Sequence, residues 1–378
     1  MNAELTDRPA ADLEPLLRPL FHAAAPGAAV AVAVIRGDER TVSCRGYTDR
    51  IGVRPVRADT RFEIGSVTKT FTALLLAEMA ARGDVRYDDP IDRYLPADAA
   101  PGYPHERPIT LLHLATHTSG LPRLPVGLTP AAVPRWFTKP YATFGPSHLL
   151  RALPRTPVRG TPGAQVRYSN LGCGLLGLVL ANAAGQRYEE LLLSRICGPL
   201  GLVDTSCGPG GEPATGYRRG RRVPSFRLPA LPGAAALRST ADDMLRYLQA
   251  HLALDAVPLP ERTDATALRT ALAEVLTPRV GRRRTGVRIC LGWNQRSPDD
   301  PRSPDDRDSA DEEDAAGVAD GLVYHAGATR GFTTFVGFSP RAQVGLAVMA
   351  GTQPMRGRGF VQGAHETLRT LVAEQRPE

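Results

Sequence analysis

A serine followed three residues later by a lysine is the first feature of this sequence that could carry out chemistry. The segment EIGSVTKTFTALLLAEMAARGDV, residues 63–85, contains Ser66 and Lys69 at this spacing. Lys and Arg together number 46, and only Lys69 and Lys139 are lysines. A partly buried lysine can lose its proton and act as a base, whereas arginine stays charged. We therefore expect Ser66 to be a nucleophile whose proton Lys69 accepts. The alternative is that Lys69 has remained by chance.

A tyrosine and an asparagine form a second candidate element, in VRYSNLG at residues 166–172. They stand at a predicted junction between a loop and a helix. Beside an ammonium group, Tyr168 could act as a general base. Asn170 could hold the Lys69 amine or a substrate amide. The alternative interpretation is a core tyrosine next to an asparagine that caps a helix.

The third candidate element is LVYHAGATRGF, residues 322–332, where His325 and Gly327 follow a predicted strand. Gly327 would let a substrate approach an edge strand closely. The backbone N–H of Ala328 could pair with that of Ser66 to form an oxyanion hole. The alternative is the end of a strand with a surface histidine.

Other catalytic schemes lack their sequence patterns. The chain has no G-x-S-x-G turn and no H-E-x-x-H pair, and GPGGEPATG at residues 208–216 lacks the lysine of a phosphate-binding loop. The five cysteines are scattered without a C-x-x-C pair, which favours free thiols over a metal site. We therefore expect neither a metal nor a cofactor.

Ser66 and Lys69 require a helix that presents both on one face, because residues three apart are neighbours on a helix surface. Gly65 and Ser66 open such a segment, and Arg82-Gly83 closes it. The apolar positions that recur between them at helical spacing are Phe71, Leu74, Leu75 and Met79. The pattern predicts a helix that begins near Ser66.

Strand patterns lie at both ends of the chain and enclose a helical, proline-rich middle. Residues 27–49 read as a hairpin, and further strands are predicted at 287–295, 322–328, 331–340 and 344–352. Helices are predicted at 12–25, 111–122, 170–185, 237–254 and 363–375. We expect an α/β fold, with an antiparallel sheet built from both termini, flanking helices and an inserted all-α lobe. Residues 1–87 and 230–378 would form the α/β domain, and residues 88–229 the lobe.

Composition limits the remaining function classes. The 378 residues are 42% hydrophobic with a net charge of +7, which is typical of a globular protein. Basic clusters at residues 217–222 and 281–286 lack interleaved aromatics, so we expect no nucleic-acid partner. No segment reaches the roughly 18 apolar residues of a membrane span, and the first residues carry no secretory pattern, so we expect a cytoplasmic protein without a membrane partner. The acidic segment at 296–321, which repeats RSPDD, is predicted to be a disordered loop.

The chain carries Ser-x-x-Lys, Tyr-x-Asn and His-x-Gly in that order. This set and order of motifs resembles that of the serine β-lactamase and penicillin-binding-protein superfamily. The sequence most resembles its class C-like branch, which includes β-lactamases, DD-peptidases, D-aminopeptidases, esterases and natural-product acyltransferases. The likeness runs from about residue 26 to residue 352 and includes RFEIGSVTKTFTA, ITLLHLATHTSGLP, YSNLGCGLLGLVL and LRSTADDM. It implies an α/β sandwich with an all-α lobe and an active site between them.

The resemblance also implies roles for individual residues. Ser66 would be the acylated nucleophile, Lys69 its proton partner and Tyr168 the general base that passes the proton to the leaving group. Asn170 would bind Lys69 and substrate, and residues 325–328 would form the strand beside the pocket. Class C β-lactamases usually carry Lys-Thr-Gly where this chain has His325-Ala326-Gly327, so a cation and a hydroxyl suited to a substrate carboxylate are missing.

The sequence thus predicts an enzyme that forms an acyl-enzyme at Ser66 from a small-molecule ester or amide. Deacylation by water would make it an intracellular esterase or amidase. Deacylation by an amine or alcohol acceptor would make it a transacylase, as in secondary metabolism. The alternatives are a β-lactamase or D-Ala-type peptidase, and a catalytically inactive binding module of the same fold.

Overall fold

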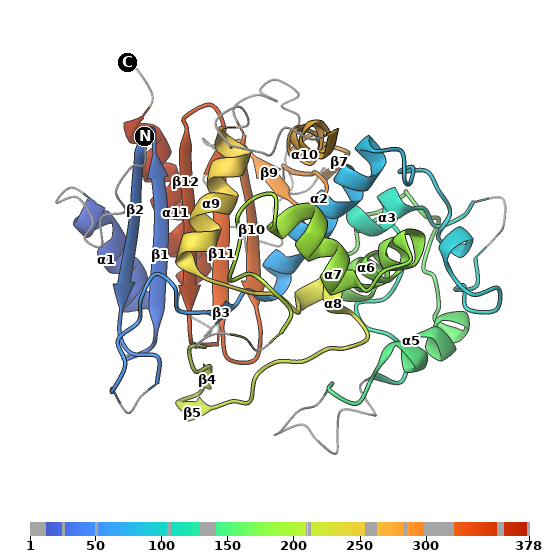
Figure 1. Cartoon of the computed structure of the whole chain (residues 1–378), viewed down its shortest axis with the longest axis horizontal. Coiled ribbons are helices and arrows are strands. Elements are labelled where there is room, and N and C mark those ends of the chain that lie inside the picture. The colour runs from blue at the N-terminus through green and yellow to red at the C-terminus, as the bar shows by residue number, and fades with distance from the viewer. Residues whose placement is uncertain are drawn as a thin grey trace.

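The structure of the chain is a computed structural model that describes residues 13–24, 27–49, 52–103, 107–128, 141–208, 210, 213–253, 263–282, 286–297, 321–353 and 359–375. The strands of its largest sheet are β1 (Val30–Arg36), β2 (Glu39–Arg45), β7 (Val280–Arg282), β8 (Val287–Ile289), β9 (Asn294–Arg296), β10 (Leu322–Ala328), β11 (Thr333–Ser339) and β12 (Val344–Ala350). Their order is β2-β1-β12-β11-β10-β9-β8-β7, and neighbouring strands are antiparallel (Figure 1). The two ends of the chain therefore meet in one sheet.

Helices cover both faces of this sheet. They are α1 (Leu13–Ala23), α9 (Ala241–Leu252) and α11 (Phe360–Glu374), whereas α10 (Thr263–Glu274) packs mainly on α2 (Thr68–Ala81). On β1, Val32 and Val34 join the core cluster beneath α1 and α11, whereas Ala33 and Ile35 join the cluster that includes α9. A strand that is buried on both faces is apolar at nearly every position, which explains the run VAVAVI in β1.

The helical region lies beside the sheet, at the right of Figure 1. Its helices are α2 (Thr68–Ala81), α3 (Leu111–Ala115), α5 (Pro146–Ala152), α6 (Asn170–Ala184), α7 (Tyr188–Leu192) and α8 (Pro232–Ala235), with shorter helical turns at η1 (Gly65–Val67), η2 (Ile91–Tyr94), η4 (Leu153–Arg155) and η5 (Leu193–Cys197). Every side chain of α2 from Thr68 to Met79 is buried. The helix that follows the nucleophile is therefore a central element, buried on all sides, and not a surface helix with one apolar stripe.

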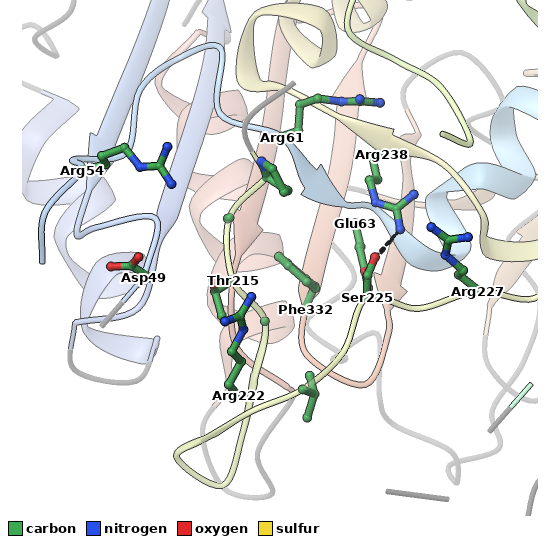
Figure 2. Close-up of a pocket in the computed structure, with 14 residues that line it drawn as sticks. Asp49, Arg54, Arg61, Glu63, Thr215, Arg222, Ser225, Arg227, Arg238 and Phe332 are labelled. Carbon is green, nitrogen blue, oxygen red and sulfur yellow. Dashed lines mark hydrogen bonds and ion pairs between the residues drawn. The ribbon is translucent and has the colours of Figure 1, made fainter. Parts of the chain in front are cut away.

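Two short ladders complete the fold. One joins β3 (Phe62–Glu63) to β6 (Arg238–Ser239), and the other joins β4 (Tyr217–Arg218) to β5 (Arg221–Arg222). Residues 213–216 run beside the segment before β3, where the backbone N–H of Ala214 donates to the carbonyl of Arg61 over 2.9 Å (Figure 2). The chain before the nucleophile is thus held by segments that are distant in the sequence.

The expected α/β fold with its large antiparallel sheet is confirmed. The segment at 287–295, predicted as one strand, forms β8 and the start of β9, because Gly292 with φ +71° allows a tight reversal between them. The division of the chain at residues 87/88 and 229/230 stays a prediction. The acidic segment predicted as a disordered loop lies outside the described residues between 298 and 320.

Candidate active site

Two glycines bring the nucleophile turn against the end of β10. Gly65 has φ +53°, and a Cβ atom on it would lie 2.7 Å from the backbone nitrogen of Ala328. A Cβ atom on Gly327 would lie 2.1 Å from the carbonyl oxygen of Ile64. Real Cβ atoms essentially never come that close, so only glycine permits this backbone contact. The N–H groups of Ser66 and Ala328, predicted to form an oxyanion hole, therefore belong to two segments packed directly on each other.

The Ser66 hydroxyl is the meeting point of the predicted catalytic side chains. Lys69 Nζ lies 2.9 Å from Ser66 Oγ, and Tyr168 Oη lies 2.7 Å from the same atom. Ser66 and Lys69 come from consecutive turns of η1 and α2, whereas Tyr168 precedes α6. The structure thus brings together the three residues for which the sequence predicted catalytic roles.

Lys69 is almost fully buried, with 1% of its surface exposed. Besides Ser66, its ammonium donates to the carbonyl of Ala234 in α8 over 2.8 Å. Among the described residues, no carboxylate lies within ion-pairing distance of Nζ. Removing a proton from Lys69 consequently breaks no ion pair. A neutral amine so placed can accept the proton that Ser66 loses on attack.

Tyr168 is not a core tyrosine, because 40% of its surface is exposed. Its ring lies against His117, with centroids 4.5 Å apart, and the Arg123 guanidinium is 5.6 Å from the ring centroid. The helix cap is Ser169, whose side chain accepts from the Gly172 N–H. The alternative interpretation of a core tyrosine next to a capping asparagine is therefore wrong.

Asn170 is the first residue of α6 and follows Tyr168 by two positions in the sequence. Its Oδ1 atom is buried and has no hydrogen-bond partner among the described residues. Within the described residues, the Lys69 amine donates to Ser66 Oγ and to the Ala234 carbonyl, so the predicted contact between Asn170 Oδ1 and Lys69 is not formed. A buried acceptor without a donor costs free energy, so Asn170 Oδ1 is suited to receive an N–H group from a substrate amide.

His325 is buried in β10 and not on the surface. Its Nδ1 atom lies 2.8 Å from the carbonyl oxygen of Gly292, which can only accept, so Nδ1 carries the proton. Burial, and next the nearby Lys69 charge, lowers the pKa of His325 to about 3. The imidazole is therefore neutral at pH 7 and supplies no positive charge to the strand beside the nucleophile.

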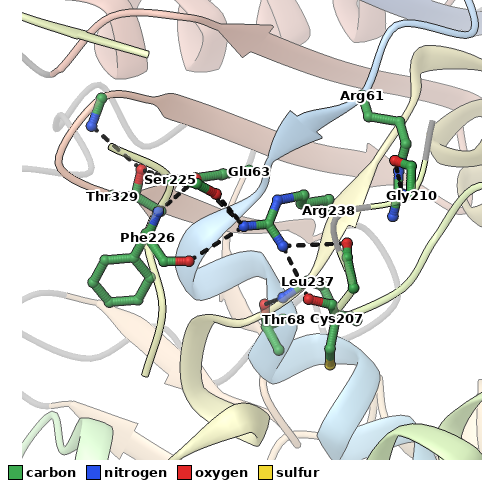
Figure 3. Close-up of polar contacts among 12 residues, drawn as sticks. Arg61, Glu63, Thr68, Cys207, Gly210, Ser225, Phe226, Leu237, Arg238 and Thr329 are labelled. Atoms are coloured by element: carbon green, nitrogen blue, oxygen red, sulfur yellow. Dashed lines mark hydrogen bonds and ion pairs between the residues drawn. The ribbon is translucent and has the colours of Figure 1, made fainter. Parts of the chain in front are cut away.

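Glu63, three residues before Ser66, ties the nucleophile turn to two loops. Its carboxylate accepts hydrogen bonds from Thr329 Oγ1 over 2.7 Å and from the Phe226 N–H over 2.7 Å. The Arg238 guanidinium lies 3.6 Å from the same carboxylate and also donates to the Cys207 carbonyl over 2.9 Å (Figure 3). Since Thr329 follows Ala328, this network fixes the backbone that carries the second candidate oxyanion donor.

Several residues near the site were not identified from the sequence. Ala234 contributes only a backbone carbonyl, which leaves no trace in a residue pattern. Arg123 and His117 reach Tyr168 through folding, and Glu63 and Thr329 meet across 266 residues. Glu63 could have been identified from its position, because it is a carboxylate just before a nucleophile turn that is expected to be buried. A buried charge needs hydrogen-bond or ion-pair partners.

In the part of the chain that the structure describes, neither a metal centre nor a membrane-spanning helix is found. Within the described ranges, no three His, Cys, Asp or Glu side chains are grouped so that they could share a metal ion. Among the helices of the described residues, none combines the length and the apolar character needed to cross a bilayer. The five cysteines are free thiols.

The chain matches a family model described as Beta-lactamase over residues 13–365. It is 29% identical to the D-alanyl-D-alanine-carboxypeptidase/endopeptidase AmpH of Escherichia coli K12, over 90% of this chain and 84% of that protein. It is 31% identical to a β-lactamase of the same strain, over 85% of this chain and 83% of that protein. The esterase EstB of Burkholderia gladioli is 31% identical over 59% of this chain and 64% of its own length.

These matches confirm the resemblance seen in the sequence motifs and point to acyl transfer of the serine-hydrolase type. They agree with a site in which a serine hydroxyl is hydrogen-bonded to a lysine and a tyrosine. The chain therefore belongs to the Beta-lactamase family, within the serine β-lactamase and penicillin-binding-protein superfamily.

Proposed function

We propose that the protein is a serine acyl-transfer enzyme that forms an acyl-enzyme at Ser66 from a small-molecule ester or amide. The observation that carries the proposal is the double hydrogen bond at Ser66 Oγ, with Lys69 Nζ at 2.9 Å and Tyr168 Oη at 2.7 Å. One group can take the serine proton while the other supplies a proton to the leaving group. A cytoplasmic location, expected from the sequence, is part of the same proposal.

In the proposed reaction, Ser66 Oγ attacks the acyl carbon as its proton passes to the Lys69–Tyr168 pair. The N–H groups of Ser66 and Ala328 stabilise the oxyanion that forms. Collapse of this intermediate breaks the bond to the leaving group, which takes the proton from Tyr168. Water, an amine or an alcohol then attacks the ester on Ser66, giving hydrolysis or transfer.

An ester or an unconstrained amide fits this site better than a β-lactam. The strand beside the nucleophile offers a neutral His325 and Ala326, so it supplies no fixed cation for a carboxylate. Esterase EstB is named for activity on esters. The competing candidate is a β-lactamase or D-Ala-type peptidase, which the names of other relatives favour. A catalytically inactive binding module is a further alternative.

The proposal is tested with a panel of activated esters, with and without an added amine. We expect a burst of leaving group equal to the enzyme concentration, which is the kinetic sign of an acyl-enzyme. If turnover after the burst rises with the amine and the acylated amine is recovered, the enzyme is a transacylase. If water alone sets that rate, it is an esterase. Absence of any burst or turnover across the panel, with intact protein, would support the binding module.

A further inference from the structure

A cavity of about 420 Å³ lies apart from the catalytic hydroxyl, amine and phenol. Four parts of the chain line it (Figure 2). They are the segment before the nucleophile, with Asp49, Arg54, Arg61 and Glu63, then residues 213–227, Arg238 and Phe332. Ser66, Lys69 and Tyr168 do not line it. It shares Glu63 with the network behind the nucleophile, so it adjoins the active site without being part of it.

The walls of this cavity carry an excess of positive charge. Two carboxylates line it, those of Asp49 and Glu63. The guanidinium groups that line it are those of Arg54, Arg61, Arg222, Arg227 and Arg238. Five guanidinium groups thus face two carboxylates, an excess of three formal positive charges, and Arg238 lies 3.6 Å from Glu63. Such a local imbalance attracts an anion.

Arg61 is the most deeply buried guanidinium in the wall. It is 3% exposed, and it donates to the carbonyl of Gly210 and to Ser206 Oγ. Its Nε atom is buried without a hydrogen-bond partner, and no carboxylate within the described residues forms an ion pair with it. The pKa of Arg61 lies below its ordinary value because of burial first and the Arg238 charge second. The charges of Asp204, Asp243 and Glu189 act against this shift from a distance, without forming an ion pair with Arg61. An anion bound in direct contact would further lower the cost of burying this charge.

The rest of the lining suits a phosphate group attached to a small organic part. Arg54 and Arg222 are exposed at the rim and approach the cavity from two different segments (Figure 2). Planar guanidinium groups match the geometry of phosphate oxygens. Phe332 and Val223 add apolar surface, and the volume exceeds that of a single ion. We propose that this cavity is a binding site for the phosphate dianion, carried by a small phosphate ester or bound as the free ion.

This site does not depend on the proposed acyl transfer, and its test keeps the two apart. Titration calorimetry on the full chain would measure binding of inorganic phosphate, phenyl phosphate and benzoate at fixed ionic strength. We expect phenyl phosphate to bind, benzoate to bind more weakly, and Ser66→Ala to leave both affinities unchanged. Equal binding of inorganic phosphate would identify the free ion as the ligand, and tighter binding of phenyl phosphate would identify an ester. Both results support the site.

A matched pair of variants locates the binding. Arg221 and Arg222 are consecutive exposed residues of β5, but only Arg222 lines the cavity. We expect Arg222→Gln to weaken phenyl phosphate binding about tenfold, as for the loss of one charge-assisted hydrogen bond, while Arg221→Gln leaves it unchanged. Arg61→Lys should also weaken binding, because it keeps the positive charge but loses the planar guanidinium that can donate two parallel hydrogen bonds to a phosphate. Equal losses in the two β5 variants, tighter binding of benzoate than of phenyl phosphate, or no binding of either phosphate would overturn the proposal.

Discussion

The phenol of Tyr168 and the hydroxyl of Ser66, 102 residues apart in the chain, are joined by a hydrogen bond of 2.7 Å. Lys69 Nζ approaches the same hydroxyl from α2 at 2.9 Å. Because Tyr168 is half exposed and Lys69 is buried, the two groups differ in their access to solvent. This difference suits Tyr168 to meet the leaving group and Lys69 to exchange a proton with Ser66 alone.

Replacing Lys69 by arginine should be nearly as damaging as replacing it by alanine. A guanidinium keeps the charge but cannot accept the serine proton, so both variants should lose the contribution of a general base, about 10²–10⁴-fold. Rates of leaving-group release in the burst phase measure this, with thermal unfolding as a check on folding. A Lys69→Arg enzyme with a near-normal burst would show that Lys69 acts only as a fixed cation.

The hydrogen bond from Thr329 to Glu63 should matter for kcat more than for KM. Thr329→Val removes the donor at 2.7 Å and loosens the backbone next to Ala328. Weakening one oxyanion donor lowers transition-state stabilisation, so we expect kcat to fall about tenfold while KM changes little. Thr329→Ser keeps the hydroxyl and serves as the matched control. The idea fails if the serine variant loses as much activity as the valine variant.

The buried His251 should make the protein less stable in acid. Both of its ring nitrogens are buried without a hydrogen-bond partner among the described residues, and burial lowers its pKa to about 3. The unfolded chain binds a proton near pH 6.5, so stability falls as pH drops from about 6.5 towards 3, with about 2 kcal/mol lost by pH 5 from this residue.

His251→Phe should remove this part of the pH dependence, since the ring already stacks on Phe338 with centroids 5.1 Å apart. Denaturant unfolding of both proteins at pH 8 and pH 5 measures the difference. An identical loss between the two pH values in wild type and His251→Phe would contradict the prediction.

The sequence was most informative where the chemistry depends on residue type at short range. Ser66 and Lys69 lie in consecutive helical turns, so their spacing alone predicted their contact. Sequence patterns could not predict that α2 is buried on all sides, because threonines such as Thr70 and Thr72 look polar until their hydroxyls find partners in the fold. The partners of Lys69 and Glu63 come from distant loops, and backbone carbonyls such as that of Ala234 carry no residue signature.

Penicillin hydrolysis should be slow compared with cleavage of a short activated ester. The neutral His325 provides no charge-assisted hydrogen bond to the carboxylate of a β-lactam, a loss of roughly 1.5–3 kcal/mol or one to two decades in rate. Steady-state assays with benzylpenicillin, nitrocefin and p-nitrophenyl acetate compare the substrates. Faster turnover of the lactams than of the ester would replace the esterase or transacylase proposal with a β-lactamase.

The central claim is that Ser66 becomes acylated, and mass spectrometry tests it most directly. The protein is mixed with p-nitrophenyl acetate, quenched in acid within the burst phase, weighed intact and then digested to map the modified residue. We predict one acetyl group per chain, located on Ser66, and none on the Ser66→Ala protein, whose unfolding temperature should be close to that of wild type. Acetylation at another residue, or undiminished ester turnover by Ser66→Ala, would contradict the claim.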